Sequence, residues 1–112
     1  MSSCIFCKIA AGEIPAQIVK QGDGIVAFKD LNPQAPTHVL VIPTTHVETL
    51  NDAKDAGLLG RLMLFARDVA REAGIGGTGY RVVVNTNSDG GQTVFHLHLH
   101  VLGGRPMKWP PG

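Results

Sequence analysis

The sequence has few of the features that would direct the chain to a membrane, out of the cell or onto a nucleic acid. Its 112 residues contain no apolar run approaching the roughly 20 residues needed to span a bilayer. Residues 1–4 lack a basic region followed by a long apolar segment, so no signal peptide is expected and a cytoplasmic location is predicted. The formal net charge of +1 provides no electrostatic attraction for nucleic acid. We therefore expect neither a membrane nor a nucleic acid as a partner.

Cysteine is also scarce, with only two residues, Cys4 and Cys7, in a Cys-x-x-Cys arrangement. Two cysteines so close together do not form the disulfide framework of a small secreted domain. On these residues alone a redox pair, a metal site and an incidental pair all remain open. With 44% hydrophobic residues among 112, the chain has the composition of one globular domain with a core of its own.

The most informative stretch is residues 95–102, in which three of the five histidines occupy every second position. Side chains alternate between the two faces of a β-strand, so His96, His98 and His100 are predicted to line one face and apolar residues the other. Neighbouring histidines would stand roughly 6.5–7 Å apart along the strand. A polar face without a chemical role would more naturally carry threonine, serine or lysine, so the pattern indicates a functional site.

The remaining elements follow from hydrophobic periodicity and turn signals. A long helix is predicted from Asn51 or Asp52 to Ala73, because apolar residues recur there every three or four positions and Gly74 can end it. A short helix is expected over residues 5–11, and further strands over residues 17–20, 25–29, 38–42 and 80–85. These elements predict an α+β fold with a five-stranded, mainly antiparallel sheet, one long helix and one short helix.

Two kinds of chemistry suit three histidines on one strand face. In the first, the imidazoles bind a metal, because His-x-His on a strand is a common ligand arrangement for zinc. In the second, one imidazole is a nucleophile and its neighbours manage protons and charge. Histidine has a pKa near 6.5, so it is largely neutral at pH 7 and can attack without a separate strong base.

The loop before the histidines favours phosphate as the target. Gly90 and Gly91 allow the backbone to approach a ligand and to present amide N–H groups to anionic oxygens. Gln92, Thr93 and, from the preceding predicted strand, Asn85 add neutral hydrogen-bond donors. Together these residues predict a pocket that accepts an anion mainly through neutral donors.

A histidine that attacks phosphorus forms a phosphorus–nitrogen bond that water can cleave. This chemistry suits substrates that carry an activated or nitrogen-linked phosphate, because their bond energies match that of the intermediate. The central His98 is the predicted nucleophile, and His100 can hydrogen-bond the non-bridging oxygens.

The histidine stretch His96-Leu97-His98-Leu99-His100-Val101-Leu102 resembles the His-φ-His-φ-His-φ-φ signature of the histidine triad (HIT) family, in which φ is apolar. The similarity extends over essentially the whole chain. It includes Ile5-Phe6, Glu13-Ile14-Pro15, Ala27-Phe28-Lys29-Asp30, Pro33-Gln34-Ala35-Pro36-Thr37-His38, Ser88-Asp89-Gly90-Gly91-Gln92, Gly103-Gly104-Arg105 and Trp109-Pro110-Pro111-Gly112. These segments resemble the Hint branch of the family, which implies that residues 1–112 form a single HIT domain.

Proteins of the Hint branch are homodimeric purine nucleoside phosphoramidases, which release a nucleoside monophosphate from adenosine or guanosine 5′-phosphoramidates. The resemblance implies that His98 becomes transiently nucleotidylated, supported by His38 and His100, while His96 has an orienting or structural role. The implied substrate-binding residues near the phosphate are Asn85, Gly91, Gln92, Thr93 and Val94. Asp30 would accept the ribose hydroxyls, and the purine slot would comprise Ile5, Phe6, Ile9, Phe28 and Leu31. Trp109 lies in a tail that reaches toward the partner subunit's active site in this family.

The resemblance also gives the cysteine pair a further interpretation. Some HIT relatives, particularly bacterial ones, hold a structural zinc ion with two such cysteines and two histidines, which correspond here to His46 and His96. The set Cys4, Cys7, His46 and His96 would form a closed zinc site, and no cofactor is expected for catalysis. Two buried thiols without a metal are the alternative.

Other functions remain open from the sequence. Dinucleoside polyphosphate hydrolysis is the activity of another HIT branch, although the Hint-like tail argues against it. A nucleotide-binding scaffold dimer with weak turnover would bind AMP without depending on catalysis, and a metal buffer would carry zinc on the triad itself. The expected partners are a purine nucleotide (AMP, GMP or their phosphoramidate derivatives) and a second copy of the chain.

Overall fold

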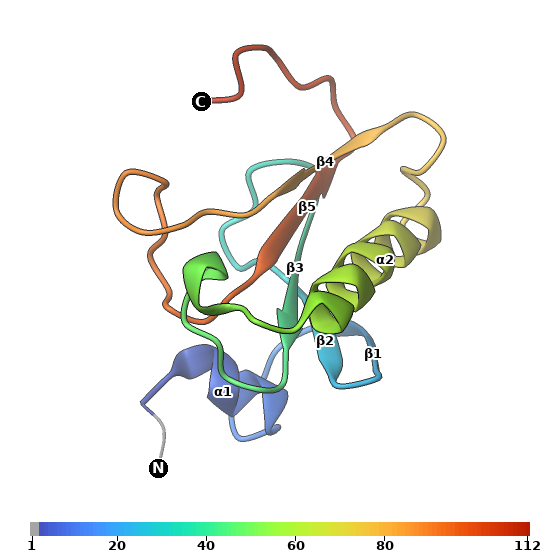
Figure 1. Cartoon of the computed structure of the whole chain (residues 1–112). Helices are drawn as coiled ribbons and strands as arrows, with labels where there is room; N and C mark the ends of the chain where they lie inside the picture. The colour runs from blue at the N-terminus through green and yellow to red at the C-terminus, as the bar shows by residue number, and fades with distance from the viewer. Residues whose placement is uncertain (1–2) are drawn as a thin grey trace.

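The computed structural model describes residues 3–112 and places them in one sheet flanked by helices (Figure 1). The strands are β1 (Ile18–Gly22), β2 (Ile25–Lys29), β3 (Thr37–Pro43), β4 (Tyr80–Val83) and β5 (Leu99–Gly103). The helices are α1 (Ile5–Ala10), α2 (Ala56–Glu72) and a 3-10 helix, η1 (Leu50–Asp52). The strand order is β1-β2-β3-β5-β4, and every neighbouring pair is antiparallel. The predicted α+β fold is confirmed. No helix within residues 3–112 is long and apolar enough to cross a membrane.

The sheet separates two apolar clusters, because successive strand residues point to opposite faces. On one face α2 packs an apolar stripe that includes Leu62 and Val69 against strand residues such as Val101. On the other face Phe6 of α1 packs edge-on against Phe28, with the ring centroids 5.4 Å apart. Burial of each side chain of this size contributes about 1.5–3 kcal/mol to the stability of the fold. The two helices therefore stabilise the sheet from both faces.

Glycine-bearing turns follow β1 and α2, and β4 is shorter than expected. Asp23 and Gly24 join β1 to β2 with φ values of 54° and 75°, which is the left-handed geometry of a tight hairpin. Gly74, with φ of 80°, follows the last turn of α2 as predicted. β4 ends at Val83, so Asn85 lies in the following loop instead of in a strand.

The long helix begins later than the sequence predicts. Thr49 and Asp52 form a reciprocal capping box around η1, and the chain then becomes extended at Ala53. α2 starts only after a second N-cap, Asp55, whose carboxylate accepts a backbone N–H of the first turn at 3.2 Å. Asn51 and Asp52 therefore belong to η1 and do not cap α2.

The histidine segment is a strand over only part of its predicted length. β5 begins at Leu99, whereas residues 95–98 are not in a strand. Its partner β3 ends at Pro43, which has no N–H to extend the ladder. The alternation persists outside the strand, because Leu97 and Leu99 both join the cluster beneath α2. The histidines between them therefore face the side of the sheet that α1 covers.

Candidate active site

Four of the five histidines gather on this face of the sheet. His38 comes from β3, His100 from β5, and His96 and His98 from the segment that precedes β5. The ring centroids of His98 and His100 lie 5.0 Å apart, and those of His38 and His100 lie 5.2 Å apart. His38, His96 and His98 are each less than a tenth exposed. The fold therefore concentrates three closely spaced imidazoles, His38, His98 and His100, in a largely dry environment.

The proton of His98 is held on the ring nitrogen that faces the protein. Its Nδ1 lies 2.7 Å from the backbone oxygen of His96. A carbonyl oxygen can only accept a hydrogen bond, so Nδ1 carries the proton and Nε2 retains a lone pair. The ring of Phe6 packs edge-on at 5.1 Å and limits its rotation. The His98 side chain thus has the tautomer and the restraint that a nucleophile requires.

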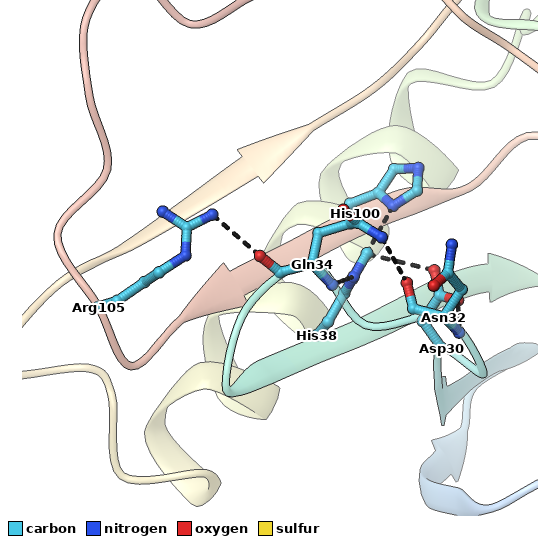
Figure 2. Close-up of polar contacts among 6 residues, drawn as sticks. All are labelled: Asp30, Asn32, Gln34, His38, His100 and Arg105. Carbon is cyan, nitrogen blue, oxygen red and sulfur yellow. Dashed lines mark hydrogen bonds and ion pairs between the residues drawn. The ribbon is translucent and has the colours of Figure 1, made fainter.

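A second hydrogen-bond chain determines the proton positions on His38 and His100 (Figure 2). The backbone N–H of Gln34 donates to Nδ1 of His38 at 3.0 Å, so the His38 proton lies on Nε2. This Nε2–H donates to Nδ1 of His100 at 2.9 Å, with a carboxylate oxygen of Asp30 at 3.3 Å. The remaining proton of His100 is therefore on its Nε2. Neutral His100 consequently offers a hydrogen-bond donor beside His98.

Burial keeps these imidazoles uncharged at neutral pH. It lowers the pKa of His38, an effect that the Asp30 carboxylate partly opposes. Burial also lowers the pKa of His98, against the hydrogen bond to the His96 carbonyl. The pKa of His100 falls to about 4, first through burial and then through the neighbouring His98 and His38. The 3.3 Å contact between His38 and Asp30 therefore joins an uncharged imidazole to a carboxylate at pH 7 and is not an ion pair.

Asp30, His38 and His100 place three ligand-type atoms within 4.8 Å of one another. A metal bound there would need a lone pair on Nε2 of His38 and a proton on its Nδ1. The Gln34 N–H already donates to that Nδ1. The required tautomer would therefore place the Nδ1–H of His38 directly against the N–H of Gln34, with no acceptor between them. The hydrogen bonds of this trio therefore favour a hydrogen-bond chain over a metal centre.

The loop before the histidines is held by its own hydrogen bonds. The Gly91 N–H donates to Ser88 O at 3.0 Å, and the Gln92 N–H donates to Asn87 O at 3.0 Å. Both N–H groups are thus engaged within the loop, so the N–H of Gly91 does not face an anion as the sequence predicted. Thr93, which is exposed, and Asn85, which is half-buried, remain as neutral polar side chains near the site.

Gln92 also differs from its predicted role as a phosphate donor. Its buried amide donates to Glu48 O at 2.8 Å and to Val94 O at 3.1 Å, and it accepts the Asn87 N–H at 3.0 Å. Both N–H groups of that amide are therefore used inside the protein. The side chain of Gln92 therefore holds the loop in shape.

Gly90 is the position where this loop tolerates no side chain. A Cβ there would lie 2.4 Å from Thr86 O and 2.7 Å from Thr86 N, and backbone cannot yield as a flexible side chain can. We expect Gly90→Ala to lower the free energy of unfolding by about 1–3 kcal/mol, measured by urea denaturation. Gly77→Ala is the matched control, because a Cβ at Gly77 meets nothing within 4 Å and should change stability by less than about 0.5 kcal/mol. Equal stability of the two variants would contradict the close approach.

The apolar residues predicted to contact the substrate, which are the five of the purine slot together with Val94 and Trp109, divide into two groups. Phe6 and Phe28 are buried, and Ile9 and Val94 are partly buried against the same cluster. Ile5 is half exposed, and Leu31 and Trp109 are 95% and 81% exposed in the single chain. A cleft of about 760 Å³ is lined by Asp30, Leu31 and His38 among others, but His98 is not part of its lining.

A second cluster joins α1 to the histidine segment. Nδ1 of His96 lies 3.4 Å from Cys4 Sγ, 3.5 Å from Cys7 Sγ and 3.3 Å from His46 Nδ1, and Cys7 Sγ lies 3.2 Å from His46 Nδ1. Ligands at about 2.0–2.3 Å from a tetrahedral zinc ion stand roughly 3.3–3.8 Å apart. Nε2 of His96 lies 2.8 Å from Pro43 O, which places its proton there and leaves Nδ1 as a ligand atom. The donor set therefore fits zinc in distance, chemistry and tautomer.

Sequence reasoning missed the residues that act through their backbone. Gln34 and the main-chain oxygens of Pro43 and His96 set proton positions, and any residue type supplies those groups. Arg105 was noted only as part of a motif, yet its guanidinium contacts Gln34 O at 2.9 Å. No residue pattern signals these contacts, because they depend on where the chain passes.

The HIT domain family model matches residues 11–107. An uncharacterised HIT-like protein of Synechocystis is 56% identical over 110 residues, which are 96% of this chain and 96% of the relative. The purine nucleoside phosphoramidase of Escherichia coli is 50% identical over 105 residues, or 92% of this chain and 88% of the relative. The crystal structure of a HIT family hydrolase from Legionella pneumophila matches with a TM-score of 0.96 and 53% identity, covering 98% of this chain and all of that one.

This chain belongs to the HIT domain family. Its relatives include hydrolases, one of which is a phosphoramidase.

Proposed function

We propose that this protein hydrolyses purine nucleoside 5′-phosphoramidates through a covalent intermediate on His98. The observation that carries the proposal is the hydrogen bond that keeps the proton of His98 on Nδ1. This leaves the lone pair on Nε2 to attack phosphorus, beside the Nε2–H donor of His100. The 50% identical relative from Escherichia coli, a purine nucleoside phosphoramidase, supports the choice of substrate class.

The reaction divides into two displacements at phosphorus. Nε2 of His98 attacks, the bond between phosphorus and the substrate nitrogen breaks, and the amine leaves with a proton taken up from solvent. The nucleotidylated imidazole is then cationic, and the hydrogen bond from Nδ1–H to His96 O stabilises it. His100 donates from Nε2 to a non-bridging oxygen. Water then attacks phosphorus, its bond to His98 breaks, and the proton lost by the water returns to solvent. This step releases the nucleoside monophosphate and regenerates neutral His98.

The substrate test compares adenosine 5′-phosphoramidate with a diadenosine polyphosphate at equal concentration. We expect AMP from the phosphoramidate at a kcat/KM at least about tenfold higher, a preference of about 1.4 kcal/mol in the transition state. Chromatography of the products measures both rates. A preference for the polyphosphate would assign the protein to the other hydrolytic reaction, and nucleotide binding without turnover of either would indicate a scaffold.

The proposal includes binding of the nucleotide across this face and assembly of two copies of the chain. Asp30 presents a carboxylate for the ribose hydroxyls at the edge of the histidine cluster, and Phe6 and Phe28 form the apolar wall for the purine. Trp109 is 81% exposed in the single chain, so its ring is available for contact with a second copy of the chain. Light scattering on the purified protein measures the subunit number.

Zinc binding by Cys4, Cys7, His46 and His96 is the second part of the proposal. The ligand-to-ligand distances of 3.2–3.5 Å support it, as does the ligand-ready Nδ1 of His96. Zinc would connect α1 to the histidine segment, since the cysteines come from the start of α1 and His96 from the chain before β5. The site is structural, because all four positions are filled by protein ligands.

A further inference from the structure

The loop between β2 and β3 holds the N–H group that sets the tautomer of His38. The Asn32 N–H donates to a carboxylate oxygen of Asp30 at 2.9 Å, and the side-chain amide of Gln34 donates to Asn32 O at 3.0 Å. These two bonds are internal to the loop. They give the loop a shape, but they do not by themselves fix its position over the ring of His38.

Arg105 supplies a tether from outside the loop (Figure 2). Its guanidinium donates to Gln34 O at 2.9 Å and to Pro106 O at 3.1 Å, so it connects the C-terminal tail to the loop. The preceding residue brings the tail into direct contact with the loop: a Cβ on Gly104 would lie 2.8 Å from Cβ of Pro36, and Gly104 has a φ of 91°. The tail therefore packs against the loop at Gly104 and hydrogen-bonds to it through Arg105.

We propose that Arg105 is a positioning residue that acts on His100 through Gln34 and His38. The Gln34 carbonyl that Arg105 holds belongs to the peptide unit next to the N–H that His38 accepts. Holding that carbonyl keeps the N–H aimed at Nδ1 of His38, which keeps the His38 proton on Nε2. That proton in turn occupies Nδ1 of His100 and confines the proton of His100 to Nε2.

Without the hydrogen bond from Arg105, the tautomers of His38 and His100 are no longer fixed. With Gln34 displaced, His38 can carry its proton on Nδ1, and His100 then carries its own on Nδ1 to donate back. His100 would lose the Nε2–H that the proposed reaction uses at the phosphate oxygen. The catalytic part of the inference rests on the proposed function, whereas the proton positions can be observed without any substrate.

The test is the tautomer of each histidine in Arg105→Met, measured from two-bond nitrogen–proton correlations in the NMR spectrum of the full chain. We expect a single tautomer for His38 in the parent protein and a mixture in Arg105→Met. With the phosphoramidate substrate, we expect kcat to fall about three- to tenfold with KM nearly unchanged, because Arg105 is not among the residues proposed to bind the nucleotide. Arg105→Lys keeps one donor and should restore the single tautomer.

Arg81→Met is the matched control for the spectra. Arg81 also donates from its guanidinium to a backbone oxygen of the tail, Lys108 O at 2.9 Å, but it has no hydrogen bond to the loop. We expect parent-like tautomers in this variant. Parent-like tautomers in Arg105→Met, or an equal change in Arg81→Met, would overturn the inference. Mixed tautomers with an unchanged kcat would overturn the link to catalysis. If the parent turns over no phosphoramidate, the proposed function fails while the spectra still decide the role of Arg105.

Discussion

His98→Ala is expected to lower the kcat for adenosine 5′-phosphoramidate by at least about 10⁴-fold while AMP still binds. The variant loses the only attacking atom of the proposed reaction, and removal of a nucleophile costs several orders of magnitude because the remaining groups stabilise a step that no longer occurs. The neighbouring imidazoles cannot substitute. Nδ1 of His100 is occupied by His38, and its Nε2 carries a proton. Single-turnover measurements of AMP release give the rate.

The intermediate itself provides the sharper measurement. Acid quenching of the parent with a labelled nucleoside phosphoramidate should trap label on the protein, and His98→Ala should trap none. In His98→Gly, added imidazole should restore part of the turnover, because the cavity left by the ring lies beside Phe6 and His100. Turnover of His98→Ala at the parent rate would rule out this mechanism.

Removal of zinc is expected to have the second largest effect, on stability. Protein purified without a histidine tag should contain about one zinc ion per chain, and His46→Asn should reduce this content towards zero. His46 is exposed, so its replacement removes a ligand with little loss of packing. A metal that binds only the folded chain contributes about 3–4 kcal/mol at 100 to 1,000 times its dissociation constant, so we expect a loss of this size in the free energy of unfolding.

Chelation is the internal control for this prediction. After treatment with a chelator, the parent and His46→Asn should unfold at the same temperature, because both then lack the metal that distinguishes them. A parent protein without zinc, or one whose unfolding temperature is unaffected by chelation, would show that the cluster holds two thiols and two imidazoles without a metal.

The regular elements were predictable because they depend on patterns within short segments. The four-, three- and four-residue spacing of Leu58, Leu62, Phe65 and Val69 predicts α2. The alternation of apolar residues and histidines predicts which side chains pack under that helix. The start of α2 was not predictable in the same way. Two acidic residues, Asp52 and Asp55, both suit an N-cap, and only the capping box with Thr49 decides that the first belongs to η1.

The candidate site was predictable in its residue types and less so in its arrangement. The spacing of His96, His98 and His100 indicated chemistry, but the strand was expected to continue where Pro43 in the adjacent strand prevents it. Gln92 was expected to donate to a ligand, yet its amide meets backbone oxygens from distant segments. Such contacts depend on tertiary proximity, which residue spacing alone does not encode.

The hydrogen bonds that fix the imidazole protons begin at main-chain groups, the N–H of Gln34 and the carbonyl of His96. A main-chain group survives every side-chain substitution at its own position, apart from replacement of Gln34 by proline. Proton placement in this site is therefore a property of the chain path. Transplanting the histidines onto another scaffold would carry over the side chains without their protonation pattern, unless residues 32–36 and the segment before β5 were transplanted in the same conformations.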